Sequence, residues 1–227
     1  MLRVLIACEE SQAVTKAFRK LGHEAFSCDL LPCSGGHPEW HYQQSVFDVI
    51  DKGWDLMIAH PPCTFLSVSG ACWMYNKDGS RNEERYQNQM DGLEFVHQLM
   101  DANIPRIAIE NPISVISTYI REPDQIIQPW MFGDEAQKTT CLWLKNLPML
   151  IPTKIVGKGE MFEWTDGKTG KIKKQPKWYA DAFMKHGTNA AERRTLRSKT
   201  FQGIADAMAQ QWSNVNIGIQ TSLMDYI

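Results

Sequence analysis

The feature that most constrains the fold is a series of short apolar segments, each followed at once by polar residues. These segments alternate with stretches whose apolar side chains recur at helical spacing, as in residues 12–21 and 85–100. Such alternation predicts right-handed βαβ units, and therefore an α/β fold whose mostly parallel sheet has helices on both faces. A short helix is also expected over residues 46–50. The predicted strands are residues 2–7, 24–28, 55–59 and 104–109.

The polar groups that follow these strands form the main functional signal. In sheets of this type, ligands bind at the carboxyl ends of the strands. We therefore expect the four groups to lie together at one edge of the sheet. They are Cys8-Glu9-Glu10-Ser11, Asp29, His60-Pro61-Pro62-Cys63 and Glu110-Asn111-Pro112.

Cys63 and Glu110 are the candidate catalytic pair. Two prolines stiffen the chain before Cys63, and Pro112 does the same after Glu110. A thiolate and a carboxylic acid suit addition to an electron-poor heterocycle, in which sulfur attacks a ring carbon and the acid meets the neighbouring ring nitrogen. A hydrolase-like pairing of His60 with Cys63 is disfavoured, because the two prolines hold these side chains apart.

Positive charge is concentrated in one part of the chain. Residues 154–199 contain 12 Lys or Arg against 5 Asp or Glu, so this segment carries +7 although the whole chain carries −2. Such asymmetry is typical of a module that meets phosphates, and a solvated polar face is the alternative. The candidate DNA-binding residues here are Lys171, Lys173, Lys174 and Lys177.

The strand and helix pattern breaks down after Pro148, where four glycines and polar turns interrupt it. We therefore divide the chain into a catalytic domain (1–149), a small insert (150–196) and a C-terminal helix and tail (197–227). The helix is expected from Ser198 onward, because one of its faces is largely apolar. That face carries Ile204, Ala207, Met208, Gln211 and Trp212.

Cysteine spacing and hydropathy bear on metal and compartment. Cys28, Cys33, His37 and His41 have a spacing that zinc would accept, but they fall on a loop without a second CxxC-like knuckle, so no metal is expected. No stretch approaches the roughly 18 apolar residues of a membrane helix. The N-terminal residues read as a strand rather than a signal peptide, so we expect a cytoplasmic protein with no membrane partner.

On the motifs HPPC and ENP, in this order after successive strands, the sequence resembles the DNA (cytosine-5) methyltransferases, especially small phage-type members. The resemblance covers most of the chain outside 150–195. It implies a Rossmann-like methyltransferase fold, S-adenosylmethionine as cofactor and double-stranded DNA as substrate, in a bacterial host or phage-infected cell. It also implies that Cys63 attacks C6 of a cytosine rotated out of the duplex and that Glu110 meets N3 of the ring.

The same resemblance implies the cofactor and base contacts. Asp29 takes the place of the acidic residue that binds the ribose, and a glycine-rich first loop is replaced by Cys8-Glu9-Glu10-Ser11. Asp48 is a second candidate beside Ser45 for the adenine. An Arg-x-Arg element that would hold the base is absent, and the nearest candidates are Lys138 and Thr140. The expected cofactor contacts are Ala7, Cys8, Glu9, Ser11, Asp29, Leu30, Ser45, Pro61, Ser198 and Thr200.

Two alternatives stay open from the sequence. The chain is either an active enzyme or a relic that binds DNA without methylating it, since the glycines and arginines are missing. A related methyltransferase acting on RNA, or with an altered cofactor, is the other alternative. The target sequence and the oligomeric state have no signal in the sequence.

Overall fold

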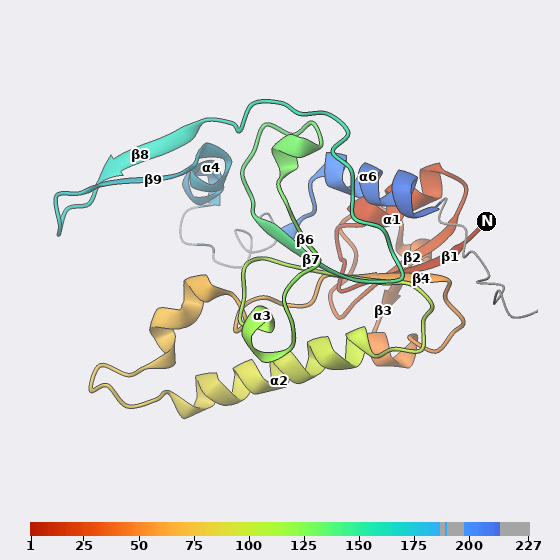
Figure 1. The fold of residues 1–227 in the computed structure, drawn as a ribbon, viewed down its shortest axis with the longest axis horizontal. Helices are drawn as coiled ribbons and strands as arrows, with labels where there is room; N and C mark the ends of the chain where they lie inside the picture. The colour runs from red at the N-terminus through yellow and green to blue at the C-terminus, as the bar shows by residue number, and fades with distance from the viewer. Residues whose placement is uncertain (187–188, 190–197, 214–227) are drawn as a thin grey trace, which may run out of the picture.

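The computed structural model describes residues 1–186, 189 and 198–213, whose main part is a seven-stranded sheet between two layers of helices (Figure 1). Only β7 runs antiparallel to its neighbours, β5 and β6, and the other pairings are parallel. This confirms the predicted α/β class and the mostly parallel sheet. In spatial order the strands are β3 (His41–Gln43), β2 (Glu24–Asp29), β1 (Arg3–Ala7), β4 (Leu56–Ala59), β5 (Ile107–Asn111), β7 (Thr140–Lys145) and β6 (Gln125–Ile127).

The central strands form because they are apolar on both sides. Every residue of β4, and every residue of β1 after Arg3, is fully buried, as expected for strands covered on both faces. The predicted strand over 104–109 is shifted in the structure, since β5 begins at Ile107, after Pro105, and ends at Asn111. Glu110 and Asn111 thus belong to the strand itself, where they pair with β7.

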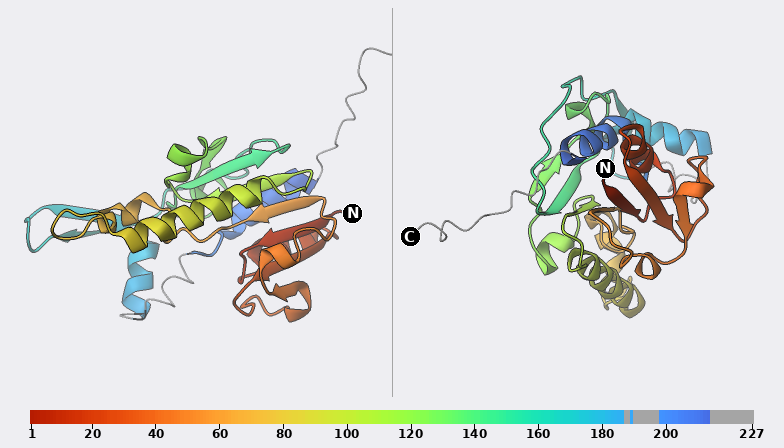
Figure 2. Two further views of the ribbon diagram at one scale, coloured as in Figure 1. Left: turned by 90° about the horizontal axis from the view of Figure 1, so that it is seen from below. Right: turned by 90° about the vertical axis from the view of Figure 1, so that its right-hand side faces the viewer.

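Two helices cover one face of the sheet and a long helix covers the other (Figure 2). On the first face, α1 (Ala13–Lys20) packs beside α6 (Gln202–Ser213), and Phe18, Met208 and Trp212 are fully buried between them and the sheet. On the second face, α2 (Glu83–Met100) buries Leu93, Val96 and Leu99. These helices confirm the apolar periodicity of the sequence, but α6 begins at Gln202 and not at Ser198 as predicted.

Short elements connect the main ones. The strands β3, β6 and β7 were not predicted, because β3 and β6 are only three residues long and β7 has no alternating pattern. The expected short helix after Ser45 is one 3-10 turn, η2 (Val46–Asp48). The other short helical elements are η1 (Pro38–Trp40), η3 (Val68–Met74), α3 (Ile116–Tyr119) and η4 (Pro129–Met131).

The predicted insert contains a separate two-stranded hairpin, formed by β8 (Met161–Thr165) and β9 (Ile172–Pro176), and then α4 (Lys177–His186). The hairpin and the η3 segment both extend past the end of the sheet where β1, β4 and β5 terminate (Figures 1 and 2). The predicted insert boundary at 196 and the tail 214–227 lie outside the described residues.

None of the helices in the described part is long and apolar enough to cross a membrane.

Candidate functional site

Backbone hydrogen bonds bring the predicted polar groups together at the carboxyl edge of the sheet. The Glu9 amide donates to the Cys28 carbonyl (3.2 Å), which places the first loop beside the end of β2. The His60 amide donates to the Ala7 carbonyl (2.9 Å), which places the Cys63 segment beside the end of β1. Glu110 follows at the end of the next strand, β5. The convergence predicted from the sequence is therefore present.

The first loop adopts conformations usually reserved for glycine, although it contains none. Cys8 and Gln12 have φ angles of 58° and 57°, in the left-handed region. Glu9 stabilises this turn: its buried carboxylate accepts from the Val14 amide (2.7 Å), the Thr15 amide (3.2 Å) and the Thr15 hydroxyl (2.7 Å). The Glu9 side chain thus caps α1. The expected contact between Glu9 and the cofactor stays a prediction.

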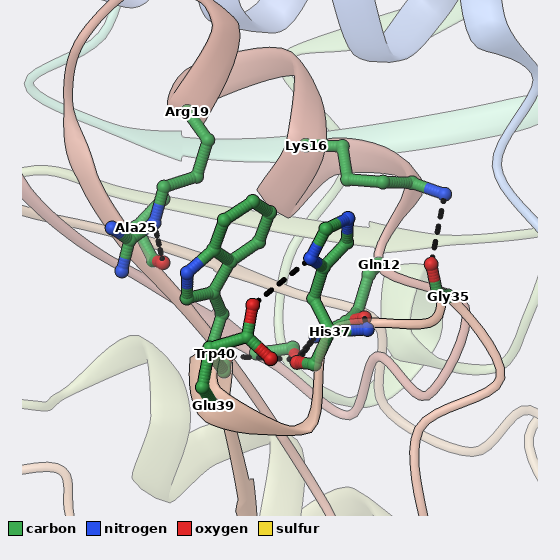
Figure 3. Close-up of polar contacts among 9 residues, drawn as sticks. Gln12, Lys16, Arg19, Ala25, Gly35, His37, Glu39 and Trp40 are labelled. Atoms are coloured by element: carbon green, nitrogen blue, oxygen red, sulfur yellow. Dashed lines mark hydrogen bonds and ion pairs between the residues drawn. The ribbon is translucent and has the colours of Figure 1, made fainter.

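The loop after Asp29 is held against α1 by Gln12 (Figure 3). The Gln12 side-chain nitrogen donates to the His37 main-chain carbonyl (2.8 Å), and the Gln12 side-chain oxygen accepts from the His37 main-chain amide (3.1 Å). A side chain on Gly35 would come within 2.5 Å of Gln12, so this close approach requires glycine. His37 stacks on Trp40 with ring centroids 3.8 Å apart. The loop that follows Asp29, the predicted ribose contact, is therefore held in place by the Gln12–His37 hydrogen bonds and the His37–Trp40 stack.

The candidate cofactor residues Asp29, Leu30 and Ser45 occupy the β2 side of this edge. One Asp29 oxygen accepts from the Leu31 amide (2.9 Å), which orients the carboxylate at the strand end. Leu30 is 73% exposed next to it. Ser45 caps η2 by accepting from the Phe47 amide (3.4 Å).

The candidate zinc ligands do not form a cluster. The Cys28 thiol donates to the Gln44 carbonyl, His41 bonds to Ser27 and the Leu31 carbonyl, and His37 bonds to Glu39. Within the described residues no three His, Cys, Asp or Glu side chains are placed to hold a metal.

The segments that carry Cys63 and Glu110 are joined side by side. The side-chain amide of Asn111 donates to the Pro61 main-chain carbonyl (2.8 Å), and His60 Nδ1 lies 3.0 Å from Glu110 Oε2. Further along, the Val115 amide donates to the Leu66 carbonyl (2.9 Å). These bonds fix the segment that carries Cys63 beside the segment that begins with Glu110.

Cys63 lies at the start of a tight turn and is exposed. Its carbonyl accepts from the amides of Leu66 (3.1 Å) and Ser67 (2.9 Å). Two other cysteines are buried, and burial raises the pKa of the Cys28 and Cys141 thiols to about 11. Because the thiolate is the reactive form, those two are poor nucleophiles. Cys63 has the exposure that a nucleophile toward a large substrate requires.

Glu110 is buried, yet its surroundings favour the ionised form. Burial alone would raise its pKa, but the hydrogen bond with His60 and the positive charge of Lys138 outweigh burial, with a smaller contribution from the Thr140 hydroxyl. The pKa of Glu110 therefore lies below its ordinary value of 4.5. Lys138 and Thr140, which the sequence nominated only as substitutes for a base-holding element, are thus neighbours of the candidate acid.

Lys138 also connects this site to the C-terminal segment. Its ammonium group donates to the Lys199 carbonyl (3.1 Å), between the predicted cofactor residues Ser198 and Thr200. Phe201, the next residue, packs edge-on against Trp178 of α4, with ring centroids 5.3 Å apart. The C-terminal motif thus returns to the catalytic domain beside the residues that precede β7.

The partner of His60 was not predicted from the sequence. In the structure, His60 Nδ1 forms a hydrogen bond with Glu110 Oε2. The available signal was positional, since a polar residue at the end of β4 stands next to one at the end of β5 in a parallel sheet.

Three of the four candidate DNA-binding lysines are ion-paired within the insert. Lys173 pairs with Asp166, Lys174 with Glu163 and Lys177 with Glu160. No such pair is present for Lys171 among the described residues. The net charge of +7 already includes these three acids, so the pairs leave it unchanged but show which lysines have an acidic neighbour.

Exposed aromatic side chains lie on both projections beside the site. On the hairpin, Phe162 and Trp164 stack with ring centroids 6.1 Å apart and stay partly exposed. On the η3 side, Trp73 and Tyr75 line a shallow cavity next to the Cys63 turn, together with Phe65, Lys77 and Arg85. Aromatic rings interleaved with cations suit contacts with unpaired bases and phosphates.

Comparison with known proteins gives fold-level likeness only. No protein-family model and no curated protein matches the chain. A candidate DNA modification methyltransferase encoded within an E. coli prophage has 14% identity and a TM-score of 0.42 over 69% of this chain and 52% of that one. The Dnmt2 methyltransferase of S. pombe has 11% identity and a TM-score of 0.49 over 94% and 99% of the two chains. An E. coli rRNA methylase has 13% identity and a TM-score of 0.34 over 64% and 57%.

The chain thus spans about half of the first of these proteins and nearly all of the second. The fold itself follows from the sheet. Its order β3-β2-β1-β4-β5-β7-β6, with β7 as the antiparallel strand, is the arrangement of the Rossmann-like S-adenosylmethionine-dependent methyltransferases, and this chain has that fold.

Proposed function

We propose that this chain is an S-adenosylmethionine-dependent methyltransferase that modifies C5 of cytosine in double-stranded DNA. The observation that supports the proposal is the joined pair of strand ends: the segment that carries the exposed residue Cys63 is hydrogen-bonded to the end of the strand that carries the buried residue Glu110. Both stand at the edge of the sheet where ligands of parallel α/β folds bind.

In the proposed reaction the target cytosine is rotated out of the duplex to reach this edge. The Cys63 thiolate forms a bond to C6, and the electron pair released makes C5 a nucleophile. A proton from solvent adds to N3 as the bond to C6 forms, and the ionised Glu110 carboxylate accepts a hydrogen bond from the resulting N3–H group and offsets its positive charge. C5 then takes the methyl group, loses its proton to a base, and the bond between sulfur and C6 breaks. The proton on N3 leaves again when this bond breaks. Neither the sequence nor the structure assigns that base.

S-adenosylmethionine, when bound, supplies the methyl group. The residues at the β1 and β2 ends suit a nucleoside of this kind. Asp29 offers a carboxylate for ribose hydroxyls, Leu30 offers exposed apolar surface for a base, and the left-handed turn at Cys8 brings the main chain close to the edge. Ser45 lies on the same side of the sheet, after β3.

The hairpin and the η3 segment supply the proposed DNA contacts. They extend past the ends of β4 and β5 (Figure 1), the two strands that lead to Cys63 and Glu110. Because three of the four candidate lysines, two on β9 and one at the start of α4, are paired with acids, we give the exposed aromatic side chains and Lys171 a larger share of the proposed DNA contacts.

DNA that contains 5-fluorocytosine tests this proposal. Fluorine cannot leave C5 as a proton does, so the enzyme is expected to become trapped as a denaturation-resistant adduct linked through Cys63. Peptide mapping decides the nucleophile, and Cys72, the other exposed cysteine, is the matched control. An adduct on Cys72 would refute the assignment of Cys63. Methyl transfer without any adduct would point instead to transfer to an exocyclic nitrogen.

The same assay separates the remaining alternatives. RNA of the same sequence is offered beside the DNA, and transfer only to RNA would replace the proposed substrate. DNA binding with no transfer to either polymer would identify a relic. Mass spectrometry of the modified base reports whether the transferred group is a methyl group.

A further inference from the structure

The contacts between the Cys63 and Glu110 segments run in register. Residue 60 contacts residue 110, and residue 61 contacts residue 111, through the pairs His60–Glu110 and Pro61–Asn111. The Pro61–Asn111 bond runs from the Asn111 side chain to the Pro61 main-chain carbonyl, so it fixes the backbone before Cys63 to the end of β5. The His60–Glu110 bond uses two side chains, and it therefore acts on the orientation of the candidate acid itself.

The hydrogen-bond chemistry of this pair is defined by the ionised state of Glu110. A carboxylate only accepts hydrogen bonds, so His60 Nδ1 must carry the hydrogen that it shares with Glu110 Oε2 at 3.0 Å. The side chains are only 10% and 11% exposed, so little water competes for the bond. One carboxyl oxygen is thereby fixed, and the plane of the carboxyl group with it.

In the described part of the chain, the second nitrogen of His60 lacks a contact like the one that Nδ1 makes with Glu110. Nε2 is buried and has no hydrogen-bond partner among the described residues. A buried polar atom without a partner costs about 1–3 kcal/mol. The histidine therefore carries this cost at the position where its other nitrogen contacts Glu110.

We propose that His60 is a positioning residue that acts through Glu110: it holds one carboxyl oxygen so that the other meets the target ring. This inference rests on the function proposed above. The other polar groups that face Glu110 come from the opposite side, namely Lys138, Thr140 and Cys141 around the start of β7. His60 is the contact from β4, the strand that leads to Cys63, and it therefore couples the orientation of the acid to the segment that carries the nucleophile.

A double-mutant cycle with single-turnover methyl transfer tests this coupling. His60→Ala is expected to lower the rate by about 10²-fold, the loss typical of a misplaced catalytic group. His60→Asn, the matched control that keeps a donor, is expected to stay within about tenfold of wild type. In the Glu110→Gln background, His60→Ala should cost less than about threefold, because the group through which it acts is already altered. An undiminished 10²-fold loss in that background would overturn the proposal.

Two measurements separate positioning from a general structural role. The rate at which iodoacetamide modifies Cys63, followed by peptide mapping, should be the same in wild type and in His60→Ala. The urea midpoint of His60→Asn is expected below that of wild type, because the smaller side chain leaves space and buries its own Oδ1 acceptor, but its rate should stay within about tenfold of wild type while the protein is folded. If His60→Asn unfolds more easily and loses activity in proportion, His60 is only a structural residue and the proposal fails.

A readout that needs no activity distinguishes this inference from the proposed function. Nitrogen-15 NMR of histidine-labelled protein, with the His60 signal assigned by its loss in His60→Asn, should show hydrogen on Nδ1. A hydrogen on Nε2 with a bare Nδ1 would overturn the inference even in an active enzyme. If wild type shows the Nδ1 hydrogen but transfers no methyl group to nucleic acid, the proposed function fails while the His60–Glu110 bond stands.

Discussion

Replacing Glu9 with alanine should destabilise the fold far more than its place in an edge loop indicates. Helix α1 has no acidic residue in its first turn, and its N-cap residue, Gln12, makes no side-chain capping bond. The Glu9 carboxylate takes over both functions from outside the helix, with three hydrogen bonds to Val14 and Thr15. Glu9 is 4% exposed, so water cannot easily replace it.

The magnitude follows from these hydrogen bonds. Loss of a capping side chain costs about 0.5–2 kcal/mol. Each buried donor left without a partner costs about 1–3 kcal/mol more, and such contributions do not add fully. We therefore expect Glu9→Ala to lower the free energy of unfolding by about 3–5 kcal/mol, equivalent to a Tm lowered by roughly 6–20 °C for a domain of this size. Glu9→Gln keeps an acceptor and should cost about 1–2 kcal/mol.

Urea unfolding checks this prediction, with Glu10→Ala as the control. Glu10 is the neighbouring residue, and the hydrogen bond that it provides to the Ser34 amide comes from its main-chain carbonyl, which the substitution keeps. Its replacement should change stability by less than about 0.5 kcal/mol. Equal midpoints for Glu9→Ala and Glu10→Ala would show that the Glu9 carboxylate does not cap α1.

Three further predictions concern the cofactor, the insert and the buried acid. Calorimetry should show weaker S-adenosylmethionine binding for Asp29→Ala than for wild type, because the substitution removes the carboxylate proposed to bind the ribose; equal affinities would contradict the assignment of Asp29. Removing one lysine–phosphate interaction flattens the salt dependence of DNA binding by about 0.9 log units, so neutralising Lys171 should change the slope more than neutralising the ion-paired Lys174, and the reverse order would be contrary to the structure. The pKa of Glu110 is depressed in the fold, so its contribution to stability is present above its ordinary value of 4.5 and is lost as pH falls through the folded value. Unfolding of Glu110→Gln should accordingly depend less on pH below 4.5 than unfolding of wild type, and parallel acid limbs would count against the His60–Glu110 bond.

Residues near each other in the chain were predictable because local rules apply to them. The burial of both faces of β1 and β4 requires continuous apolar runs, and α1 and α2 require apolar residues at helical spacing. The order of strands and helices then favours a parallel sheet, which brings the strand ends to one edge. Cys63 and Glu110 could be nominated in this way without any knowledge of which strands are neighbours.

The charged insert shows where such reasoning stops. A count of lysines along the sequence predicts a basic surface, but the antiparallel pairing of β8 with β9 places Lys174 opposite Glu163. Pairing across strands depends on register, and a shift of one residue would turn each side chain to the other face. The net charge of the segment was therefore predictable, whereas the amount of free positive charge was not.

The sequence by itself determined the α/β alternation, the strand-end motifs and the identity of the candidate nucleophile and acid, because all of these depend on local patterns. Only the tertiary structure decided that Glu9 caps a helix and that His60 fixes Glu110. The latter two residues are 50 positions apart, and their hydrogen bond exists because β4 pairs with β5 in a particular register. Likewise, the pKa of Glu110 is raised by burial and lowered by His60 and Lys138. His60 follows β4 and Lys138 precedes β7, so the two groups reach Glu110 from different strands. The balance between desolvation and hydrogen bonding depends on positions in space, which are not encoded in any single stretch of chain.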